Sequence, residues 1–346
     1  MQKKYSLLGL FIVVLFIICL IQPYLSLNTI TGLFFQEQPQ EIPSYIQDEG
    51  NISVFFCPQE DCEGNLVQFL DSAQESIHCA LFEINLVSVQ QKLLEKSTQM
   101  DVKVVTDNDY LKEFNHSFVK ADSWGLMHNK FCIIDGKKVS SGSMNPTNNC
   151  AHKNNNNLLL INSEVLANNY EEEFQEMWNG TFKKGQKVRN SQIKLGDTFI
   201  QNYFCPEDNC GEKVKAELKK AEKSIYFMQF SFTHESIANA LLLKNLDNVT
   251  IKGVMETQQI SPDSKFKVMQ AQGIDVWKDG NKYKLHHKVW IIDERCVVTG
   301  SFNPSASGDS RNDENVLIIC NSEIVAQFVQ EFWKIYSQAS NLTQYS

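Results

Sequence analysis

Apolar residues follow the spacing of strands in some segments and that of helices in others, and the same series of segments occurs twice along the chain. Runs of apolar residues typical of buried strands occur at 76–84 and 101–107, and again at 224–232 and 249–257. Between the two runs of each pair, the pattern is that of a helix. Strands that alternate with helices of this length predict an α/β fold, with a mixed sheet flanked by helices in each half of the chain.

The two series also share local sequence, which indicates an internal duplication. The stretch VFFCPQEDC that begins at Val54 matches NYFCPEDNC from Asn202, and the closing helix that contains Tyr170 matches the one that contains Val329. A duplicated unit can pack around a pseudo-two-fold axis, which brings equivalent residues together at a shared interface. We expect an N-terminal segment at 1–27, a linker at 28–50, a first domain at 51–180, a linker at 181–197, a second domain at 198–338 and a tail at 339–346.

Each half carries the same spaced set of polar residues: His-x-Lys, an Asp five residues after the Lys, and then Gly-Ser-x-Asn. The set comprises His128, Lys130, Asp135, Ser143 and Asn145 in the first half, and His286, Lys288, Asp293, Ser301 and Asn303 in the second. Either short pattern alone would be weak evidence. Both patterns, repeated at identical spacing within a duplication, strongly indicate one functional site.

Strand geometry explains the spacing of this set. Residues i and i+2 of a strand share a face, so His128 is expected beside Lys130. Asp135-Gly136 is a hairpin turn signal, and the returning strand is expected to bring Asn145 towards His128. The second half predicts the same arrangement, which would place two His, two Lys and two Asn together. We expect the two Asp residues to support the turn and the sheet.

This combination of side chains suits a phosphodiester substrate. Two ammonium groups neutralise the non-bridging oxygens, and the Asn amides and Ser hydroxyls can donate hydrogen bonds to them. One imidazole can attack phosphorus while the other protonates the leaving oxygen. The sequence does not assign these two roles to His128 and His286. Glu314 is expected to accept from a ring N–H of His286, and Asn156, at the matching position, to orient His128.

The cysteines predict two local disulfides. Cys57–Cys62 and Cys205–Cys210 are pairs with the same spacing and context, and each can close a turn in an oxidising compartment. A rival hypothesis places all four in one zinc site, although no Cys-x-x-Cys knuckle is present. The remaining candidates in apolar runs, Cys79, Cys132 and Cys296, are expected to be small buried hydrophobes.

The N-terminus and the overall charge bear on location and partners. Lys3 and Lys4 precede an apolar run from Leu7 to Ile21, as in a signal peptide or a signal anchor, and the lack of a clear cleavage site favours an anchor. The enzyme would then be a membrane-attached, lumenal or extracellular glycoprotein of the secretory pathway. A formal net charge of -9 argues against a surface that binds nucleic acid everywhere, but it leaves room for a local basic cleft.

The paired motifs resemble those of the phospholipase D superfamily, HxK(x)4D(x)6GSxN, and the resemblance covers nearly the whole chain after the N-terminal segment. It is strongest to the small-domain group that includes a bacterial nuclease and mitochondrial cardiolipin hydrolase. Members of that group are dimers, whereas this chain supplies both halves, which implies a monomer. The resemblance also implies a two-step reaction through a phosphohistidine, without metal or cofactor. An acidic residue usually stands at both orienting positions, and Asn156 departs from that pattern.

Three functions follow as hypotheses. Hydrolysis of membrane phospholipid is favoured by the membrane-tethering segment and the acidic charge. Cleavage of single-stranded nucleic acid by the same site is the alternative. A non-catalytic binding module is disfavoured because both motifs are intact. The sequence leaves open whether water or another alcohol accepts the phosphoryl group.

Overall fold

The computed structural model describes residues 45–123 and 125–343. The apolar N-terminal segment expected to be a signal anchor lies outside these ranges. Among the described residues, no helix is both long and apolar enough to cross a membrane.

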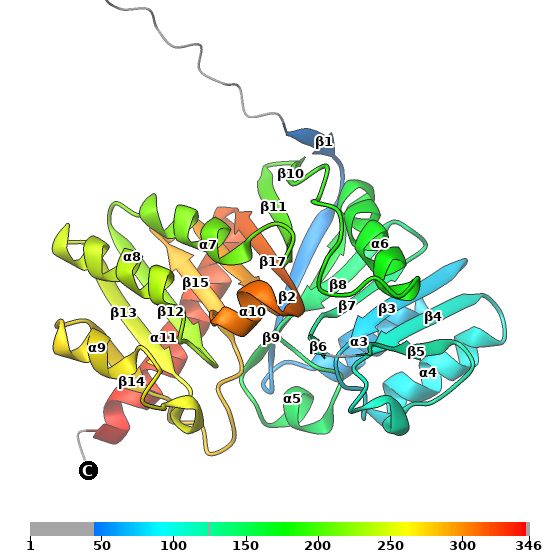
Figure 1. The fold of residues 1–346 in the computed structure, drawn as a ribbon, viewed down its shortest axis with the longest axis horizontal. Coiled ribbons are helices and arrows are strands. Elements are labelled where there is room, and N and C mark those ends of the chain that lie inside the picture. The colour runs from blue at the N-terminus through cyan, green and yellow to red at the C-terminus, as the bar shows by residue number, and fades with distance from the viewer. Residues whose placement is uncertain (1–44, 124, 344–346) are drawn as a thin grey trace, which may run out of the picture. The chain divides into compact units, whose positions relative to one another are not determined.

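Each half folds as a mixed sheet flanked by helices, which confirms the predicted α/β class (Figure 1). The elements of the first half are β2 (Asn51–Cys57), α3 (Cys62–Asp71), β3 (Ser76–Leu81), α4 (Val87–Ser97), β4 (Asp101–Thr106), η1 (Leu111–Glu113), β5 (Val119–Ala121), β6 (Leu126–Met127), β7 (Lys130–Ile134), β8 (Lys138–Gly142), α5 (Asn148–His152), β9 (Asn156–Asn162) and α6 (Glu164–Trp178). Those of the second half are β11 (Thr198–Cys205), α7 (Cys210–Lys219), β12 (Ser224–Gln229), α8 (Glu235–Leu246), β13 (Thr250–Met255), η2 (Thr257–Gln259), α9 (Phe266–Ala271), β14 (Asp275–Lys278), β15 (Lys288–Ile292), β16 (Cys296–Gly300), α10 (Ala306–Ser310), β17 (Asn312–Cys320) and α11 (Ser322–Thr343).

The strand orders of the two sheets correspond one to one. The first sheet runs β2-β9-β8-β7-β3-β4-β5, and the second contains β11-β17-β16-β15-β12-β13-β14 in the same order. Two short strands extend the second sheet at its β11 edge, namely β1 (Ile46–Asp48) and β10 (Gln192–Leu195), which pair with each other. Both lie in ranges expected to be linkers. The closing helix α11 likewise continues to Thr343, into the range expected to be a tail.

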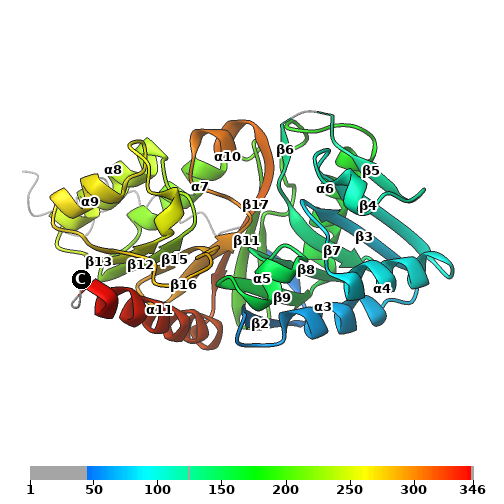
Figure 2. The same cartoon turned by 90° about the horizontal axis from the view of Figure 1, so that it is seen from below.

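The helices α6 and α11 pack on the sheet faces that form a core shared by both halves. In α6, Tyr170, Phe174 and Met177 follow helical spacing and are all buried, and the Ser163 hydroxyl caps the helix by accepting from the Leu166 N–H. The Tyr170 ring meets Phe204 of the second half at 5.0 Å between ring centroids. Figure 2 shows α11 on the opposite side of the second sheet from α8 and α9.

The hairpins that follow the His-x-Lys segments are fixed by the two motif aspartates. Asp135 has a positive φ of 55°, as the turn between β7 and β8 requires. Its carboxylate accepts from the backbone N–H groups of Glu75 and Ser76, at 2.7 and 3.1 Å. Asp293 does the same at the start of β12, where it accepts from the N–H groups of Lys223 and Ser224 at 2.7 and 2.9 Å. Each aspartate therefore ties its hairpin to the start of the neighbouring strand.

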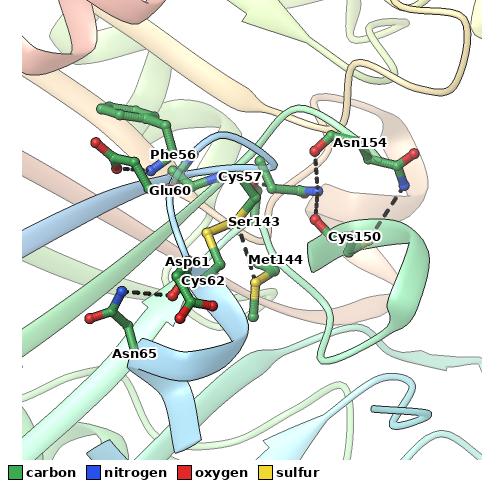
Figure 3. Close-up of a disulfide and its surroundings, with 12 residues drawn as sticks. Phe56, Cys57, Glu60, Asp61, Cys62, Asn65, Ser143, Met144, Cys150 and Asn154 are labelled. Atoms are coloured by element: carbon green, nitrogen blue, oxygen red, sulfur yellow. Dashed lines mark hydrogen bonds between the residues drawn. A yellow bond between two sulfur atoms is a disulfide. The ribbon is translucent and has the colours of Figure 1, made fainter. Parts of the chain in front are cut away.

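Four disulfides connect the described cysteines, with Cys150 left as a buried free thiol. Two of them are Cys57–Cys62, which is drawn in Figure 3, and Cys205–Cys210. These pairings exclude the zinc site, because all four sulfurs are consumed.

The prediction that Cys79, Cys132 and Cys296 are unpaired hydrophobes was wrong. Cys79 in β3 lies directly opposite Cys132 in β7, and Cys296 in β16 directly opposite Cys320 in β17, so each pair is bridged between adjacent strands. Which cysteines face each other depends on the register between the paired strands, and that register is set only in the folded sheet.

We expect the Cys79→Ala, Cys132→Ala double variant to lose about 2–5 kcal/mol of unfolding free energy, because its disulfide closes a long loop in the unfolded chain. The separation of the two cysteines is 53 residues. Chemical denaturation of the variant and the wild type measures the difference. Cys150→Ala is the matched control for loss of a buried sulfur alone, and an equal loss in that variant would contradict a role for the cross-link.

Candidate active site

The two motif histidines are buried at the interface of the halves, and backbone hydrogen bonds cross that interface at both. The His128 N–H donates to the Asp313 carbonyl of β17 at 3.0 Å, and the His286 N–H donates to the Asn155 carbonyl at 2.8 Å. Each histidine is 7 % exposed. The start of each His-x-Lys segment is therefore positioned by the opposite half of the chain.

The residues that orient the imidazoles also come from the opposite half. Glu314 Oε2 lies 2.7 Å from His128 Nδ1, and Asn156 Oδ1 lies 2.8 Å from His286 Nδ1. The expected pairing of Glu314 with His286 and of Asn156 with His128 was therefore wrong. The reason is that β9 and β17 begin at the interface, where each runs alongside the His-x-Lys segment of the other half.

These contacts fix the tautomer of His286. Its Nδ1 faces two oxygens that only accept, Asn156 Oδ1 and the Ser143 carbonyl at 3.1 Å, so the ring proton resides on Nδ1. The lone pair of neutral His286 is therefore on Nε2. Glu314 has the same effect on His128, with the difference that its carboxylate also stabilises the imidazolium form.

Burial lowers the pKa of both histidines, and their neighbours make the two unequal. The pKa of His128 falls to about 4, chiefly through burial and also through Lys130 and Lys288, while Glu314 acts in the opposite direction. Burial, Lys288 and Lys130 hold the pKa of His286 well below its ordinary value. Because only His128 has a carboxylate partner, His128 is the better proton carrier of the two.

The two motif lysines present a pair of buried amines beside the histidines. Lys130 Nζ donates to the His128 carbonyl at 2.5 Å, and Lys288 Nζ to the His286 carbonyl at 2.8 Å. Burial lowers the pKa of Lys130 to about 8. Burial and the charge of Lys130 hold the pKa of Lys288 well below its usual value. An anion bound between them would favour both charged forms.

The Asn and Ser residues of the Gly-Ser-x-Asn segments differ in how they are engaged. The side chains of Asn145 and Asn303 have no hydrogen bond to any described residue, which leaves both amides able to donate to a ligand. The hydroxyls of Ser143 and Ser301 instead accept from the backbone N–H groups that follow Asn156 and Glu314, at 3.0 and 2.9 Å. Ser143 also donates to Asn156 Oδ1 at 3.3 Å. Its hydroxyl therefore helps to position Asn156, which in turn orients His286.

The sequence reasoning missed two asparagines that lock the halves together. Asn157 Nδ2 lies 3.0 Å from His287 Nδ1. At the equivalent position Asn315 Nδ2 donates to Asn129 Oδ1 at 2.8 Å. Both contacts hold the middle residue of the opposite His-x-Lys segment. The signal was present, because Asn is the third residue of both matched triplets, 155–157 and 313–315.

Two acidic residues and two aromatic rings complete the surroundings and were also missed. Asp107 and Glu256 accept from the N–H groups of the residues just before the histidines, Met127 at 3.2 Å and Leu285 at 2.6 Å. The rings of Phe82 and Phe230 contact the two imidazoles and lie near the two lysine Nζ atoms. Groups of described acidic, His or Cys side chains close enough to share a metal ion occur only elsewhere.

Comparisons with known proteins place the whole arrangement in one family. The family model described as "Cardiolipin synthase, PLD-like domain" matches residues 66–178 and 214–336, more than half of the chain. A phospholipase D from Rickettsia typhi is 30% identical over 168 residues, which cover 44% of this chain and 81% of that protein. A mitochondrial cardiolipin hydrolase from Xenopus tropicalis is 32% identical over 143 residues, which cover 39% of this chain and 68% of that protein.

One solved structure shares the fold over most of this chain. Phosphatidylserine synthase from Haemophilus influenzae superposes with a TM-score of 0.61 at 13% identity, covering 80% of this chain and 84% of that one. The family match falls once on each half, as the internal duplication requires. The chain therefore belongs to the phospholipase D superfamily, and it is a phosphodiesterase of that superfamily, a hydrolase of phosphoric diester bonds.

Proposed function

We propose that the protein hydrolyses the phosphodiester bond of a phospholipid through a covalent phosphohistidine. The observation that carries this proposal is the pair of imidazoles, each fixed at Nδ1 by the opposite half and each accompanied by a buried lysine. Two anchored nitrogens and two amines provide a nucleophile, a proton carrier and charge neutralisation for one phosphate group.

Within this mechanism His286 is the nucleophile and His128 the acid and base. A nucleophile must be neutral, and His286 has only neutral acceptors at Nδ1, with a pKa held well below the ordinary value. A general acid must carry a proton, and His128 has the carboxylate of Glu314 to stabilise that form. Asn156 stands where an acidic residue is usual, so the two histidines have different partners, and this difference distinguishes their roles.

The reaction proceeds in two displacements at phosphorus. In the first, His286 Nε2 bonds to phosphorus while the bond to the leaving oxygen breaks, and that oxygen takes the proton of His128. In the second, His128 takes a proton from water, whose oxygen bonds to phosphorus as the bond to His286 breaks. The lysines, Asn145 and Asn303 stabilise the charge on the non-bridging oxygens.

We expect Glu314→Gln to move the high-pH limb of the kcat/KM profile to lower pH. His128 must be protonated to act as an acid, so activity of the free enzyme rises as pH falls towards its pKa of about 4. Removing the carboxylate lowers that pKa further, which should reduce kcat/KM at neutral pH on the order of 10²-fold. If kcat/KM fell over the same pH range in the variant as in the wild type, and the stability were also unchanged, the proposed support of His128 as general acid by Glu314 would be contradicted.

Membrane lipid is favoured as the substrate by three observations. The matched relatives from Rickettsia and Xenopus bear the names phospholipase D and mitochondrial cardiolipin hydrolase. The net charge of -9 is unfavourable for general nucleic-acid binding. The apolar N-terminal run would hold the enzyme at a membrane.

A second candidate, cleavage of single-stranded nucleic acid, is favoured by one surface feature. Tyr283 is 39% exposed, and the Nζ atoms of Lys153 and Lys282 lie 5.5 and 5.0 Å from its ring centroid. Asn281 ties this loop to the first half by donating to Asn155 Oδ1 at 2.7 Å. An exposed ring with two cations near it, three residues before His286 in the sequence, can stack a base while the lysines neutralise phosphates.

We also propose a lumenal or extracellular location for a monomeric, N-terminally anchored enzyme. Four disulfides support an oxidising compartment. The chain has five Asn-x-Ser/Thr glycosylation sequons, and their asparagines are all exposed, namely Asn51, Asn115, Asn179, Asn248 and Asn341. Treatment of the cell-derived protein with a glycosidase tests this proposal, and an unchanged gel mobility would count against it.

A competition assay distinguishes the two substrate classes. Vesicles of phosphatidylcholine and phosphatidylglycerol with labelled head groups, and a labelled single-stranded oligonucleotide, are offered together to the purified protein in EDTA. Head-group release that is lost in His128→Ala and His286→Ala supports the phospholipase proposal, whereas oligonucleotide cleavage lost in both variants replaces it with a nuclease. Turnover of neither substrate, or turnover only with added metal, would contradict the mechanism.

A further inference from the structure

A buried carboxylate outside the active site has no cation to balance it. Glu173 of α6 is only 5% exposed, and its carboxylate has no hydrogen bond or ion pair with any described residue. Carboxylate oxygens of Glu173, Glu176 and Glu207 lie within 4.8 Å of one another. Glu207 Oε2 is buried and likewise without a partner among the described residues. Glu173 and Glu176 line a cleft of about 330 Å³, and Glu207 comes from the loop between β11 and α7.

The duplication supplies an internal comparison for this cluster. The equivalent of Glu173 is Glu331 of α11, which is also buried and lines the equivalent cleft of about 240 Å³. There Lys334 forms an ion pair with Glu331, one helical turn away. In the first half the position of Lys334 is taken by Glu176. The cation of one half is therefore replaced by a carboxylate in the other.

The loop residue that faces each cleft also differs between the halves, and the first half again carries the additional negative charge. The second-half cleft faces Gln59, whereas the first-half cluster contains Glu207 at the matching position of the Cys-Pro-x-x-x-Cys turn. The residue after each of these is acidic in both halves. Glu60 accepts from the Phe56 N–H, as drawn in Figure 3, and Asp208 accepts in the same way from the Phe204 N–H at 3.0 Å. The extra negative charge of the first-half cluster is thus confined to Glu176 and Glu207.

The linker between the halves closes over this cluster. The Gln186 N–H donates to both oxygens of Glu176, at 3.0 and 3.2 Å. A Cβ on Gly185 would fall 1.8 Å from Glu176 Oε2 and 2.7 Å from Glu207 Oε1, so the linker backbone contacts both carboxylates. The linker therefore closes one side of the cluster with backbone that donates an N–H group to Glu176.

The electrostatics of the cluster require a positive charge or a shared proton. Burial raises the pKa of Glu173 well above its ordinary value, and Glu207, Asp313 and Glu176 raise it further. The pKa of Glu207 rises to about 7, again chiefly through burial. The cations that line the cleft, Lys187 and Arg189, are exposed.

We propose that Glu173, Glu176 and Glu207 bind a divalent cation of the size of Ca²⁺, in the place that the ammonium of Lys334 occupies in the second half. Ca²⁺ takes oxygen ligands at roughly 2.3–2.6 Å, so ligands across one ion are about 5 Å apart, which matches the observed grouping of the carboxylate oxygens. The ion would join α6 of the first half to the β11–α7 loop of the second. Its role is to stabilise the assembled halves and not to take part in the reaction.

Calcium titration of the purified protein, with equilibrium dialysis and thermal unfolding as readouts, tests this proposal. We expect about one Ca²⁺ per chain, and a Tm roughly 5 °C higher at a hundredfold excess over Kd than in EDTA. Glu207→Gln should weaken binding at least tenfold. Glu331→Gln is the matched control from the second half, and it should retain the Ca²⁺ response whatever its own stability.

Glu176→Lys provides a test that does not depend on loss of folding. This variant installs the lysine of the second half, so it should unfold in EDTA at or above the Tm of the Ca²⁺-loaded wild type and should bind no Ca²⁺. A wild-type Tm that responds to pH but not to Ca²⁺ would show that the carboxyls share a proton instead, and would overturn the proposal. Hydrolysis measured in EDTA well below the Tm is unaffected by either outcome, so the proposed function is tested separately.

Discussion

Replacing His286 with alanine is expected to lower kcat by at least about four orders of magnitude on any phosphodiester, because the bond to phosphorus can no longer form. Replacing His128 should cost on the order of 10³–10⁴-fold on a lipid, whose alkoxide leaving group needs a proton. With bis(p-nitrophenyl) phosphate the first step should survive in His128→Ala, because nitrophenolate leaves without protonation. That variant should therefore release a burst of about one nitrophenolate per active site and then stop, since the second step lacks its base.

The control for these variants is His116→Ala, because His116 packs against Phe114 and Phe118 and has no contact with the motif residues. It should retain wild-type kcat. A burst in His286→Ala and none in His128→Ala would reverse the two roles. Equal, small losses in both variants would remove the histidines from the mechanism.

Replacing Lys130 or Lys288 with methionine should lower kcat/KM by roughly 10²–10³-fold each, because a preorganised positive charge on the non-bridging oxygens is lost. The stability of the fold should not fall together with the activity, since removing a buried charge relieves its desolvation cost. An unchanged or raised Tm together with the lost activity would therefore separate catalysis from stability. Lys219→Met, at an exposed position on α7, is the matched control.

A pH series adds a second readout of the lysines. The pKa of Lys130 in the free enzyme is about 8, so its ammonium form is present below that value and is lost above it. Wild-type kcat/KM should carry a contribution from Lys130 that disappears above pH about 8. In Lys130→Met this contribution should be absent at every pH. If wild-type kcat/KM showed no additional fall above pH 8 and the variant kept full activity, the electrostatic role of Lys130 would be contradicted.

The sequence predicted the fold and named the residues of the candidate site because both inferences depend on local pattern. Apolar spacing gives strands and helices, and the duplicated His-x-Lys and Gly-Ser-x-Asn segments identify residues that strand geometry brings together. The hairpin aspartates follow from the same local geometry, and Asp135 and Asp293 lie where a turn requires them. Beyond local pattern, these inferences needed only the general expectation that duplicated halves pack around a pseudo-two-fold axis.

What the sequence could not supply is the direction of contacts across the interface. Glu314 is close to the second His-x-Lys segment in sequence, yet it contacts His128 of the first. The cross-strand disulfides were missed for a related reason, because the partner of Cys79 depends on the register between β3 and β7. Pairing across a pseudo-two-fold axis is set by packing of the shared core, and no local pattern encodes it.

In the proposed mechanism, the asymmetry between Glu314 and Asn156 gives each half of a nearly symmetric site a different role. A dimer of identical domains must place the same residue at both orienting positions. A fused chain can vary one position at a time, and here the change leaves a carboxylate on one imidazole only. Asn156→Asp tests this directly. It should raise the pKa of His286 towards that of His128 and lower the rate of the nucleophilic step at acidic pH.

The most direct test of the central claim is mass spectrometry of His128→Ala that has been quenched under alkaline denaturing conditions after mixing with bis(p-nitrophenyl) phosphate. The mechanism predicts a single covalent nitrophenyl phosphate adduct, which peptide mapping locates on His286. The same treatment of His286→Ala should give no adduct. An unmodified chain in both variants, or an adduct on a residue other than the two motif histidines, would contradict a phosphohistidine mechanism.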